Sequence, residues 1–323
     1  MLDFYRQLAA LLQDEAVVVA TVIQVRGSAP REVGAKMIIR ADGSIVGTIG
    51  GGAGEALVID RAQSVLVTGN SQAVQIDLSG KPHRDSQGVC GGDVTVWLAR
   101  WRGQTMLTLA HRIVAALSNH RSLTLVTPLS PHQGPYVLDS PTHDASLSIL
   151  TNEFFTETLQ PPPLLLIVGA GHCAIPLAHM AHLVGFQVVV QDDRPEFATL
   201  ERFPDATMVL AQPIAPALAT LAHVPSLYAA LVTRGYTWDV AALTLLLQRP
   251  TYYIGMIGSH KRVKTVFQAL VQAGVPGIDS VSVAMLQQAV HAPIGLDIGA
   301  LTPEEIAVSI CAELIQVRRK SNP

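Results

Sequence analysis

The chain contains little cysteine, with 3 such residues among 323. Cys90, Cys173 and Cys311 lie far apart, so they neither match the paired spacing of zinc ligands nor form a disulfide framework. The amino-terminal segment also lacks a basic region followed by an apolar core, which is the pattern of an export signal. We therefore expect a cytoplasmic protein, whose thiols stay reduced.

Charged residues are scarce as well, at 15% of the chain, and the formal net charge is −3. This balance gives no electrostatic reason to expect nucleic acid or an anionic membrane as a partner. A long apolar stretch, 164–190, is interrupted by glycine, histidine and proline, so no run reaches the ~18 to 20 residues of a membrane span. The G-x-S-x-G and H-E-x-x-H motifs of serine hydrolases and zinc proteases are missing too.

Apolar residues, in contrast, make up 49% of the chain. At this length they suffice for two buried cores, and their abundance predicts an apolar interface in a homodimer. Pro161-Pro162-Pro163 stands near the midpoint, where proline favours an extended connector. We therefore predict an amino-terminal domain over 1–155, a connector over 156–163 and a carboxyl-terminal domain over 164–323.

The first half has the pattern of a mixed α+β domain. Ala41-Asp42-Gly43, between two apolar runs, marks a β-hairpin. Expected helices cover 2–12, 55–67 and 106–119, and expected strands cover 16–25, 36–40, 44–49, 74–78, 93–98, 123–126, 135–138 and 146–150.

The second half alternates strands with helices, which predicts an α/β fold with a parallel, doubly wound Rossmann-like sheet covered on both faces. Thr302-Pro303-Glu304-Glu305 supplies an N-cap, a first-turn proline and a capping glutamate for the last helix. Expected strands cover 164–168, 187–191, 207–211, 227–232 and 251–257, and expected helices cover 173–184, 213–222, 238–248 and 259–273.

A dinucleotide-type turn follows the strand over 164–168. Gly169, Gly171 and Ala174 form G-x-G-x-x-A, in which glycines permit a tight turn and close approach of a phosphate, and the small third residue permits close packing. Asp192 lies 21 residues after Gly171, near the position of a ribose-binding acid. The alternative is a Rossmann fold whose site is lost or reused. The predicted ligand contacts are Gly169, Gly171, His172, Ala174, Asp192 and Asp193.

A second anion site is predicted where another strand ends in glycine, at Gly258, Ser259, Lys261 and Arg262. Cations in the first turn of a helix oppose its dipole, and a bound anion relieves that conflict. The alternative is a solvated basic turn. If both turns bind ligand, they meet at the carboxyl edge of the sheet.

Two glycine-rich segments mark the first half. Gly51 and Gly52 precede a helix and permit approach to an anion or partner, although this half alone favours the alternative, a tight crossover between strand and helix. Cys90 is followed by two glycines and preceded by Gly88-Val89, which removes steric cover from its thiol. An uncovered thiol suits contact with a metal or sulfur centre, whereas Cys311 belongs to the core of the last helix.

Longer motifs occur in both halves. The first half contains Gly27-Ser28-Ala29-Pro30-Arg31-Glu32, Gly47-Thr48-Ile49-Gly50-Gly51-Gly52 and Cys90-Gly91-Gly92. The second contains Gly169-Ala170-Gly171-His172, Asp192-Asp193-Arg194-Pro195-Glu196-Phe197, Ile257-Gly258-Ser259 and His291-Ala292-Pro293-Ile294-Gly295-Leu296-Asp297-Ile298-Gly299-Ala300. Together they resemble the xanthine dehydrogenase accessory protein family (XdhC/CoxI) over nearly the whole chain. Residues 232–239 depart from that family's pattern, so we assign them no role.

The resemblance implies a maturation factor, not itself an enzyme, that binds molybdenum cofactor, helps its sulfuration by a cysteine desulfurase and delivers it to a molybdenum hydroxylase. The turns at 169–174 and 258–262 would hold the phosphate of this cofactor, and Cys90 would face its molybdenum or sulfur if the two domains close on each other. An alternative is an NAD(H)-dependent oxidoreductase whose first half is the substrate domain, since the glycine turn alone favours NAD(P) or another nucleotide. A further alternative is an adaptor that binds only proteins.

Overall fold

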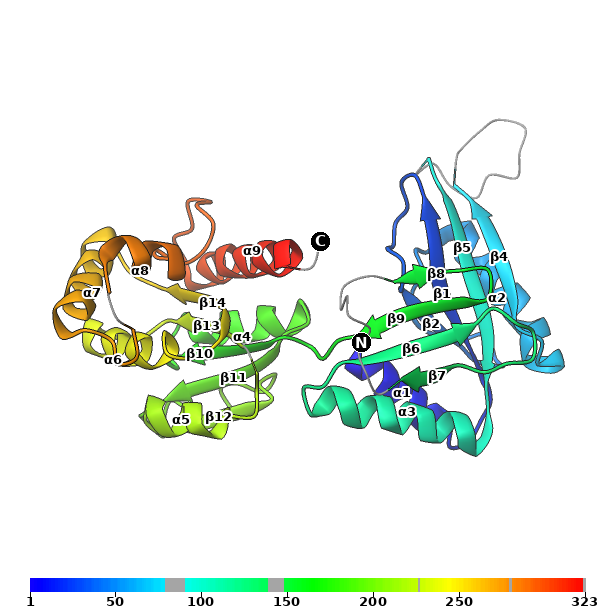
Figure 1. Ribbon diagram of the computed structural model, residues 1–323, viewed down its shortest axis with the longest axis horizontal. Helices are drawn as coiled ribbons and strands as arrows, with labels where there is room; N and C mark the ends of the chain where they lie inside the picture. Colours follow the sequence, from blue (N-terminus) through cyan, green and yellow to red (C-terminus); the bar gives the residue numbers. More distant parts are fainter. Residues whose placement is uncertain (79–90, 139–147, 226, 279–280, 322–323) are drawn as a thin grey trace. The chain divides into compact units, whose positions relative to one another are not determined.

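The computed structural model describes residues 1–78, 91–138, 148–225, 227–278 and 281–321 (Figure 1). The chain divides into two compact units, residues 1–161 and residues 162–323. Among the described residues, no helix is both long enough and apolar enough to cross a membrane.

The first unit contains a five-stranded antiparallel sheet with the order β3-β2-β1-β5-β4. Its central strand β1 (Val17–Arg26) is an almost continuous apolar run, and its first seven residues are buried. Such a run is typical of a strand that is covered on both faces. The other strands are β2 (Lys36–Ile39), β3 (Ile45–Gly47), β4 (Gln72–Asp77) and β5 (Asp93–Trp101).

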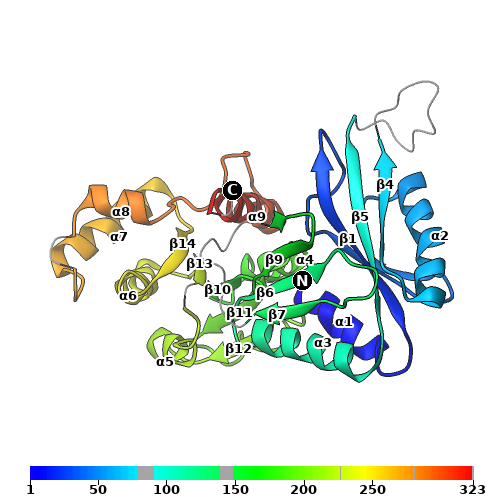
Figure 2. The same cartoon turned by 45° about the vertical axis from the view of Figure 1, so that its right-hand side comes forward.

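Both faces of this sheet are covered. Helix α2 (Gly52–Thr68) packs on one face through Val58, Ala62 and Val65. The other face packs against helices α1 (Leu2–Leu11) and α3 (Gly103–Ser118) and a second antiparallel sheet (Figure 2). The second sheet has the order β7-β6-β9-β8, with β6 (Leu123–Pro128), β7 (Tyr136–Leu138), β8 (Ile149–Leu150) and β9 (Phe154–Leu159). The mixed α+β fold predicted for the first half is confirmed.

Two boundaries in the first unit differ from the prediction. Residues 156–159, expected in the connector, belong to strand β9, which pairs with β6 in antiparallel register. Buried and partly exposed residues alternate along β9, as in a strand with one covered face, but the three prolines after it favour a connector in the sequence. The connector starts only at Gln160. Helix α2 begins at Gly52 instead of residue 55. The residue before it, Gly51, has φ +76°, a backbone conformation that glycine adopts without the steric cost other residues have, so the chain can turn directly into the helix.

A buried ion pair links the two sheets of the first unit. Nζ of Lys36, at the start of β2, lies 2.5 Å from Oε1 of Glu157 in β9. The two side chains are 3% and 5% exposed. Such a pair is stable only while both charges are present, because each compensates the desolvation of the other.

The second unit contains a five-stranded parallel sheet with the order β12-β11-β10-β13-β14. The chain starts at the centre with β10 (Leu164–Val168) and moves outward through β11 (Gln187–Asp192) and β12 (Met208–Ala211). It then returns to the other side of β10 with β13 (Leu227–Leu231) and β14 (Thr251–Met256). Ligands of such sheets bind beyond the carboxyl ends of the strands, where the strand order reverses. Here that place lies between β10 and β13.

Helices cover both faces of the parallel sheet, as predicted. Alternate residues of a strand face opposite sides, so Leu164, Leu166 and Val168 belong to one core and Leu165 and Ile167 to the other. Figure 1 shows the helices in these two layers. The second face is covered by α4 (Ala174–Leu183) and α9 (Pro303–Ser321), and the first by α5 (Ile214–Thr220), α6 (Tyr236–Leu246), α7 (His260–Ala273) and α8 (Val283–Ala289). The predicted Rossmann-like fold is confirmed.

Helix α8 lies in a segment for which the sequence predicts no element. It has seven residues, of which Leu286 is buried, so its apolar residues do not establish a helical period. The Ser282 side chain caps it by accepting a hydrogen bond from the Met285 N–H.

Candidate functional site

The glycine turn after β10 has the geometry predicted from its sequence. Gly169 has φ +102°, and a Cβ there would lie 2.8 Å from the carbonyl oxygen of Val232. Within the described chain, no heavy atom lies within 4 Å of a Cβ built on Gly171. The first glycine is therefore required for the turn itself, whereas the second leaves open space in front of the backbone, which suits the approach of a ligand.

Asp192, at the end of β11, is buried under this turn. Its Oδ2 accepts a hydrogen bond from the Ala170 N–H at 2.8 Å, and the Arg194 guanidinium donates to both carboxylate oxygens at 2.9 Å. Burial opposes ionisation, but the hydrogen bonds from Arg194 and from the backbone of Ala170 and Arg194 outweigh it. The pKa of Asp192 therefore lies well below its usual range. This carboxylate holds the turn and is already supplied with donors.

Replacing Asp192 with asparagine is expected to destabilise the chain at neutral pH and to have a smaller effect below about pH 4. A carboxyl whose pKa is lower in the folded state stabilises the fold above its unfolded pKa, and this stabilisation is lost as the pH falls through the folded pKa. Thermal unfolding of both proteins between pH 7 and pH 3 measures the difference. Asp60→Asn, an exposed change, is the control. A difference that does not depend on pH would contradict the assignment.

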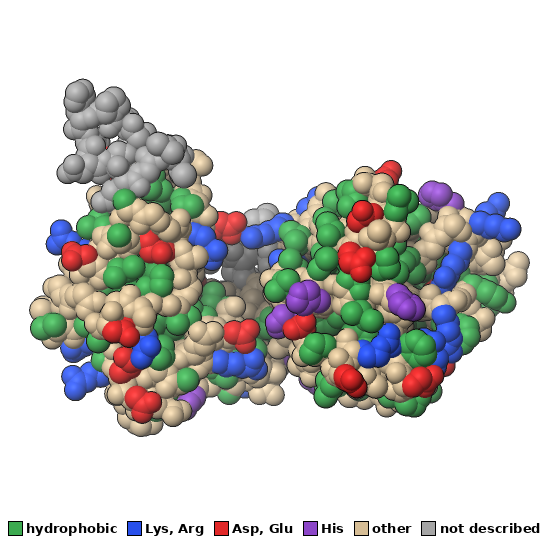
Figure 3. All heavy atoms as spheres, turned by 180° about the vertical axis from the view of Figure 1, so that it is seen from behind, with side chains coloured by type: hydrophobic (Ala, Val, Ile, Leu, Met, Phe, Trp, Pro, Cys, Tyr) green, Lys and Arg blue, Asp and Glu red, His purple; other side chains and the backbone are tan. Residues whose placement is uncertain are grey.

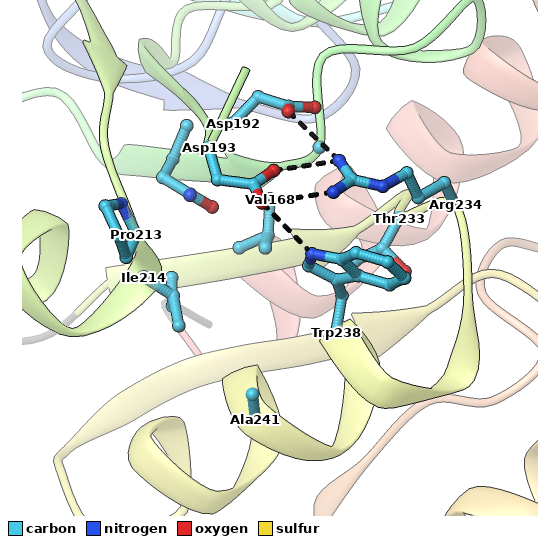
Figure 4. A pocket seen from close by; sticks show the side chains of 11 residues that line it. Val168, Asp192, Asp193, Pro213, Ile214, Thr233, Arg234, Trp238 and Ala241 are labelled. Carbon is cyan, nitrogen blue, oxygen red and sulfur yellow. Dashed lines mark hydrogen bonds and ion pairs between the residues drawn. The ribbon is translucent and has the colours of Figure 1, made fainter.

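A pocket of about 210 Å³ opens beside the turn, at the switch point of the sheet (Figure 4). Its walls come from the ends of β10, β11 and β13, from the segment after β12 and from α6. The lining residues are Val168, Gly169, Gln191, Asp192, Asp193, Pro213, Ile214, Thr233, Arg234, Trp238 and Ala241.

Three exposed side chains form a cluster at this pocket. Arg234 donates to both oxygens of Asp193, at 2.8 and 3.0 Å, and its guanidinium carbon lies 3.8 Å from the centre of the Trp238 ring. The Trp238 indole N–H donates to the same carboxylate at 3.4 Å. Hydrogen bonding from Arg234 lowers the pKa of Asp193, so this carboxylate is ionised at neutral pH.

Residues 232–239 contribute side chains to this pocket. We assigned them no role because they depart from the resembled pattern, yet Thr233, Arg234 and Trp238 line the pocket that contains Gly169. The parallel-sheet topology is the signal that would have found them, because the segment after β13 must lie opposite the turn after β10.

The remaining residues of the turn have different surroundings. His172 is exposed, whereas Ala174 is fully buried at the start of α4 and packs in the core under the sheet. Ala174 therefore has the packing function predicted for the small third residue of the motif. Cys311 is buried in the same core, as predicted.

The second predicted turn lines another pocket, of about 610 Å³. Gly258 and Ser259 follow β14, so this turn lies at the same carboxyl edge as Gly169, but the two pockets have different lining residues throughout. The opposite wall is the loop 293–300, in which Gly295 and Gly299 have positive φ.

The loop of the second pocket is held by Glu313 of α9, which sequence reasoning did not identify. This buried carboxylate accepts hydrogen bonds from the Tyr253 hydroxyl, the Gly295 N–H and the ring of His291. Burial raises the pKa of Glu313, but hydrogen bonds from His291, Tyr253 and Gly295 outweigh it, so the pKa is lowered. A single acidic residue within an amphipathic helix does not indicate, from the sequence alone, that its carboxylate holds a loop elsewhere in the fold.

The two basic residues of the second turn, Lys261 and Arg262, have different surroundings. Arg262 donates through Nε to Oδ2 of Asp239 at 2.7 Å and through Nη2 to Oγ1 of Thr233 at 2.8 Å. We expected Arg262 at an anion, but these contacts tie α7 to the segment after β13. Lys261 is exposed, and the Ser259 hydroxyl caps α7 by accepting from the Arg262 N–H.

Gly51 and Gly52 belong to the first unit and are exposed. The Glu55 carboxylate accepts hydrogen bonds from the Gly51 N–H at 3.2 Å and the Ile49 N–H at 3.1 Å, so it fills the turn before α2. Cys90 lies outside the described residues. Within the described part of the chain, no group of three or more His, Cys, Asp or Glu side chains is placed to hold a metal ion.

The charged side chains of the described residues are interspersed on the face drawn in Figure 3, with acidic and basic groups among apolar ones. This mixture accords with the net charge of −3. Recognition at the pockets therefore depends on individual side chains more than on a broad field of one sign.

Comparisons with known proteins indicate the same family for both halves of the chain. A family described as the XdhC Rossmann domain matches residues 165–314, and the XdhC and CoxI family matches residues 10–77. A probable xanthine dehydrogenase subunit of Bacillus subtilis is 29% identical over 98% of both chains. The molybdenum cofactor insertion chaperone PaoD of Escherichia coli is 23% identical over 96% of this chain and 86% of its own. A crystal structure described as a xanthine dehydrogenase of Bacillus halodurans is 30% identical, with a TM-score of 0.81 over 99% of this chain and 96% of that one.

Proposed function

Since this chain belongs to the XdhC and CoxI family, we propose that it is an accessory factor that binds molybdenum cofactor and delivers it to a xanthine dehydrogenase-type molybdenum hydroxylase. The observation that carries the proposal is the similarity over 96% of the chain to a molybdenum cofactor insertion chaperone. In this proposal the protein acts in the cytoplasm as a homodimer and has no turnover of its own.

The geometry of the second unit supports a role in cofactor binding. Molybdenum cofactor carries a phosphate on a pterin whose dithiolene binds the metal, so a carrier needs places for a ring, a phosphate and a metal. The smaller pocket offers an indole ring and a carboxylate, and the open backbone at Gly171 lies on the turn beside it. The larger pocket presents the glycine-rich loop 293–300 opposite Ser259. Backbone N–H groups at such turns suit a phosphate.

We further propose that the protein assists sulfuration of the cofactor by a cysteine desulfurase, with Cys90 near the molybdenum or the incoming sulfur. The sequence places Gly88-Val89 before this thiol and two glycines after it, a pattern with little steric cover that suits contact with such a group. In the same proposal, Gly51 and Gly52 permit close approach of the cofactor or a partner to the first unit.

The test is transfer of cofactor from the full-length protein. The apoprotein is incubated without oxygen with molybdenum cofactor released from a denatured molybdenum enzyme and is separated from free cofactor by gel filtration. It is then added to a client enzyme that lacks cofactor. We expect cofactor to elute with the protein and to activate the client, whereas Cys90→Ala should carry cofactor but deliver less of the sulfurated form. Absence of cofactor from the protein fraction would refute the proposal.

The Gly169 turn also favours a second candidate, an oxidoreductase that uses NAD(H). Calorimetric titration with NAD, NADH and molybdenum cofactor separates the two. Saturable NADH binding followed by reduction of a carbonyl substrate would support the oxidoreductase. Binding of molybdenum cofactor without such turnover would support the carrier.

A further inference from the structure

In the cluster at the smaller pocket, the carboxylate of Asp193 binds a planar cation, the guanidinium of Arg234, through two hydrogen bonds. Arg234 presents two N–H donors side by side to the two oxygens of Asp193, at 2.8 and 3.0 Å. The guanidinium lies over the Trp238 ring, 3.8 Å from its centre. Asp193 and Trp238 therefore form a binding place for a flat group with two parallel N–H donors, and a side chain of the same unit fills it (Figure 4).

A guanidinium has a close chemical relative among ring compounds. The 2-amino-4-oxopyrimidine ring of a pterin or a guanine contains a cyclic guanidine, with a ring N–H beside an exocyclic amino group. These two donors have the spacing that a carboxylate accepts in bidentate fashion, and the ring offers a flat face for stacking. An adenine lacks this pair of donors.

Resting on the proposed function, we propose that Asp193 and Trp238 recognise the cyclic guanidine edge of a pterin or guanine ring, and that Arg234 occupies this place until the ligand displaces it. Arg234 then lies beside the bound ring without its bidentate partner and keeps only its longer contact, 3.4 Å, to Oδ1 of Asp192. A phosphate-bearing ligand supplies the anion that such a cation binds.

The neighbouring Asp192 does not compete for this function. Its side chain is 3% exposed, and the backbone of Ala170 and the Arg194 guanidinium already occupy its oxygens, while Arg234 reaches its Oδ1 only at 3.4 Å. The Asp193 side chain is 36% exposed, so a ligand can reach it. The two adjacent acids therefore have separate tasks, one in holding the turn and the other in recognition.

The size and walls of the pocket fit one flat ring system. Its volume of about 210 Å³ lies below the roughly 300 to 1,000 Å³ of sites for drug-sized ligands. Pro213, Ile214 and Ala241 give it apolar walls, which suit the faces of a heterocycle. The phosphate and the metal of a larger cofactor then lie outside this pocket.

The test uses calorimetric titration of the full chain with ligands that carry no phosphate. The probes are 6-hydroxymethylpterin, guanosine and adenosine. We expect the pterin, guanosine or both to bind at least about tenfold more tightly than adenosine, because adenosine cannot supply two parallel donors to the carboxylate. Preference for the pterin assigns the site to a pterin cofactor, and preference for guanosine assigns it to a guanine nucleotide; either supports edge recognition.

Two variants distinguish recognition from simple proximity. Asp193→Asn should weaken pterin binding at least about tenfold, because its amide presents a donor to a donor. Arg234→Gln should strengthen binding of the unphosphorylated pterin several-fold, because the internal competitor is gone. Asp205→Asn, an acid-to-amide change among residues that do not line this pocket, should change nothing. Equal binding of adenosine, no effect of Asp193→Asn, or weaker pterin binding by Arg234→Gln would each overturn the inference.

The failure of this inference differs from failure of the proposed function. If wild type and Asp193→Asn capture molybdenum cofactor equally, the carrier function stands and the recognition of the ring edge is refuted. If neither the wild-type protein nor any variant captures the cofactor, the carrier function is refuted, and the pterin and guanosine titrations still decide the chemistry of the pocket.

Discussion

Replacing Lys36 with methionine is expected to lower the free energy of unfolding by about 3 to 5 kcal/mol, because it leaves the carboxylate of Glu157 buried without its partner. Nζ of Lys36 lies 2.5 Å from Oε1 of Glu157, and both side chains are almost completely buried. Tyr5 is a second buried polar residue near Glu157, and its hydroxyl has no hydrogen-bond partner among the described residues. Burial, and to a smaller extent the charge of Glu157, raises the pKa of Tyr5. Urea unfolding followed by circular dichroism measures the loss.

A double variant tests whether the loss comes from the unpaired charge. Lys36→Met combined with Glu157→Leu removes both charges, so it should recover most of the lost stability. Lys264→Met changes an exposed lysine and should alter stability by no more than about 0.5 kcal/mol. If the single variant costs less than about 1 kcal/mol, or if the double variant is as unstable as the single one, the pair does not stabilise the fold in this way.

Replacing Gly169 with alanine is expected to destabilise the chain by about 2 to 5 kcal/mol. Two costs combine, since the residue has φ +102° and the added Cβ would lie 2.8 Å from the Val232 carbonyl oxygen. The backbone atoms that it meets belong to the neighbouring strand segment and cannot move aside as a flexible side chain does. Thermal and urea unfolding measure the effect.

Gly171→Ala is the matched control for this change. It adds the same methyl group two residues later, where no heavy atom of the described residues lies within 4 Å. Stability should change by no more than about 0.5 kcal/mol, but ligand binding at the turn should weaken because the methyl group occupies the open space. Equal destabilisation by both variants would show that the turn does not distinguish its two glycines.

Local sequence signals predicted most of the second unit. Each strand is a short apolar run before a turn or helix signal, and β10 ends at the glycine motif, so strands, helices and Gly169 follow from neighbours in sequence. Strand β9 was missed because it has alternating character beside three prolines. Glu157 in this strand pairs with Lys36, which lies 121 residues earlier in the sequence, so no local pattern connects the two.

The candidate site was predictable to the same extent. Spacing identified Asp192 and Asp193, but not that the first is buried and held by Arg194 whereas the second is partly exposed and held by Arg234, because this difference depends on those two arginines. Trp238 enters the pocket from a helix that begins after β13. Such residues become visible only when the strand order is known, since the sheet brings together segments that are distant in sequence.

Glu313 gives the second pocket a dependence on the order of synthesis. The loop 293–300 ends just before α9 (Pro303–Ser321), but its Gly295 N–H, together with the His291 ring and the Tyr253 hydroxyl, finds a shared acceptor only in Glu313, inside α9. A chain that is still on the ribosome has the glycine loop without the carboxylate that fixes it. The pocket therefore takes its final form after α9 has emerged, when nearly the whole Rossmann sheet is already available for packing.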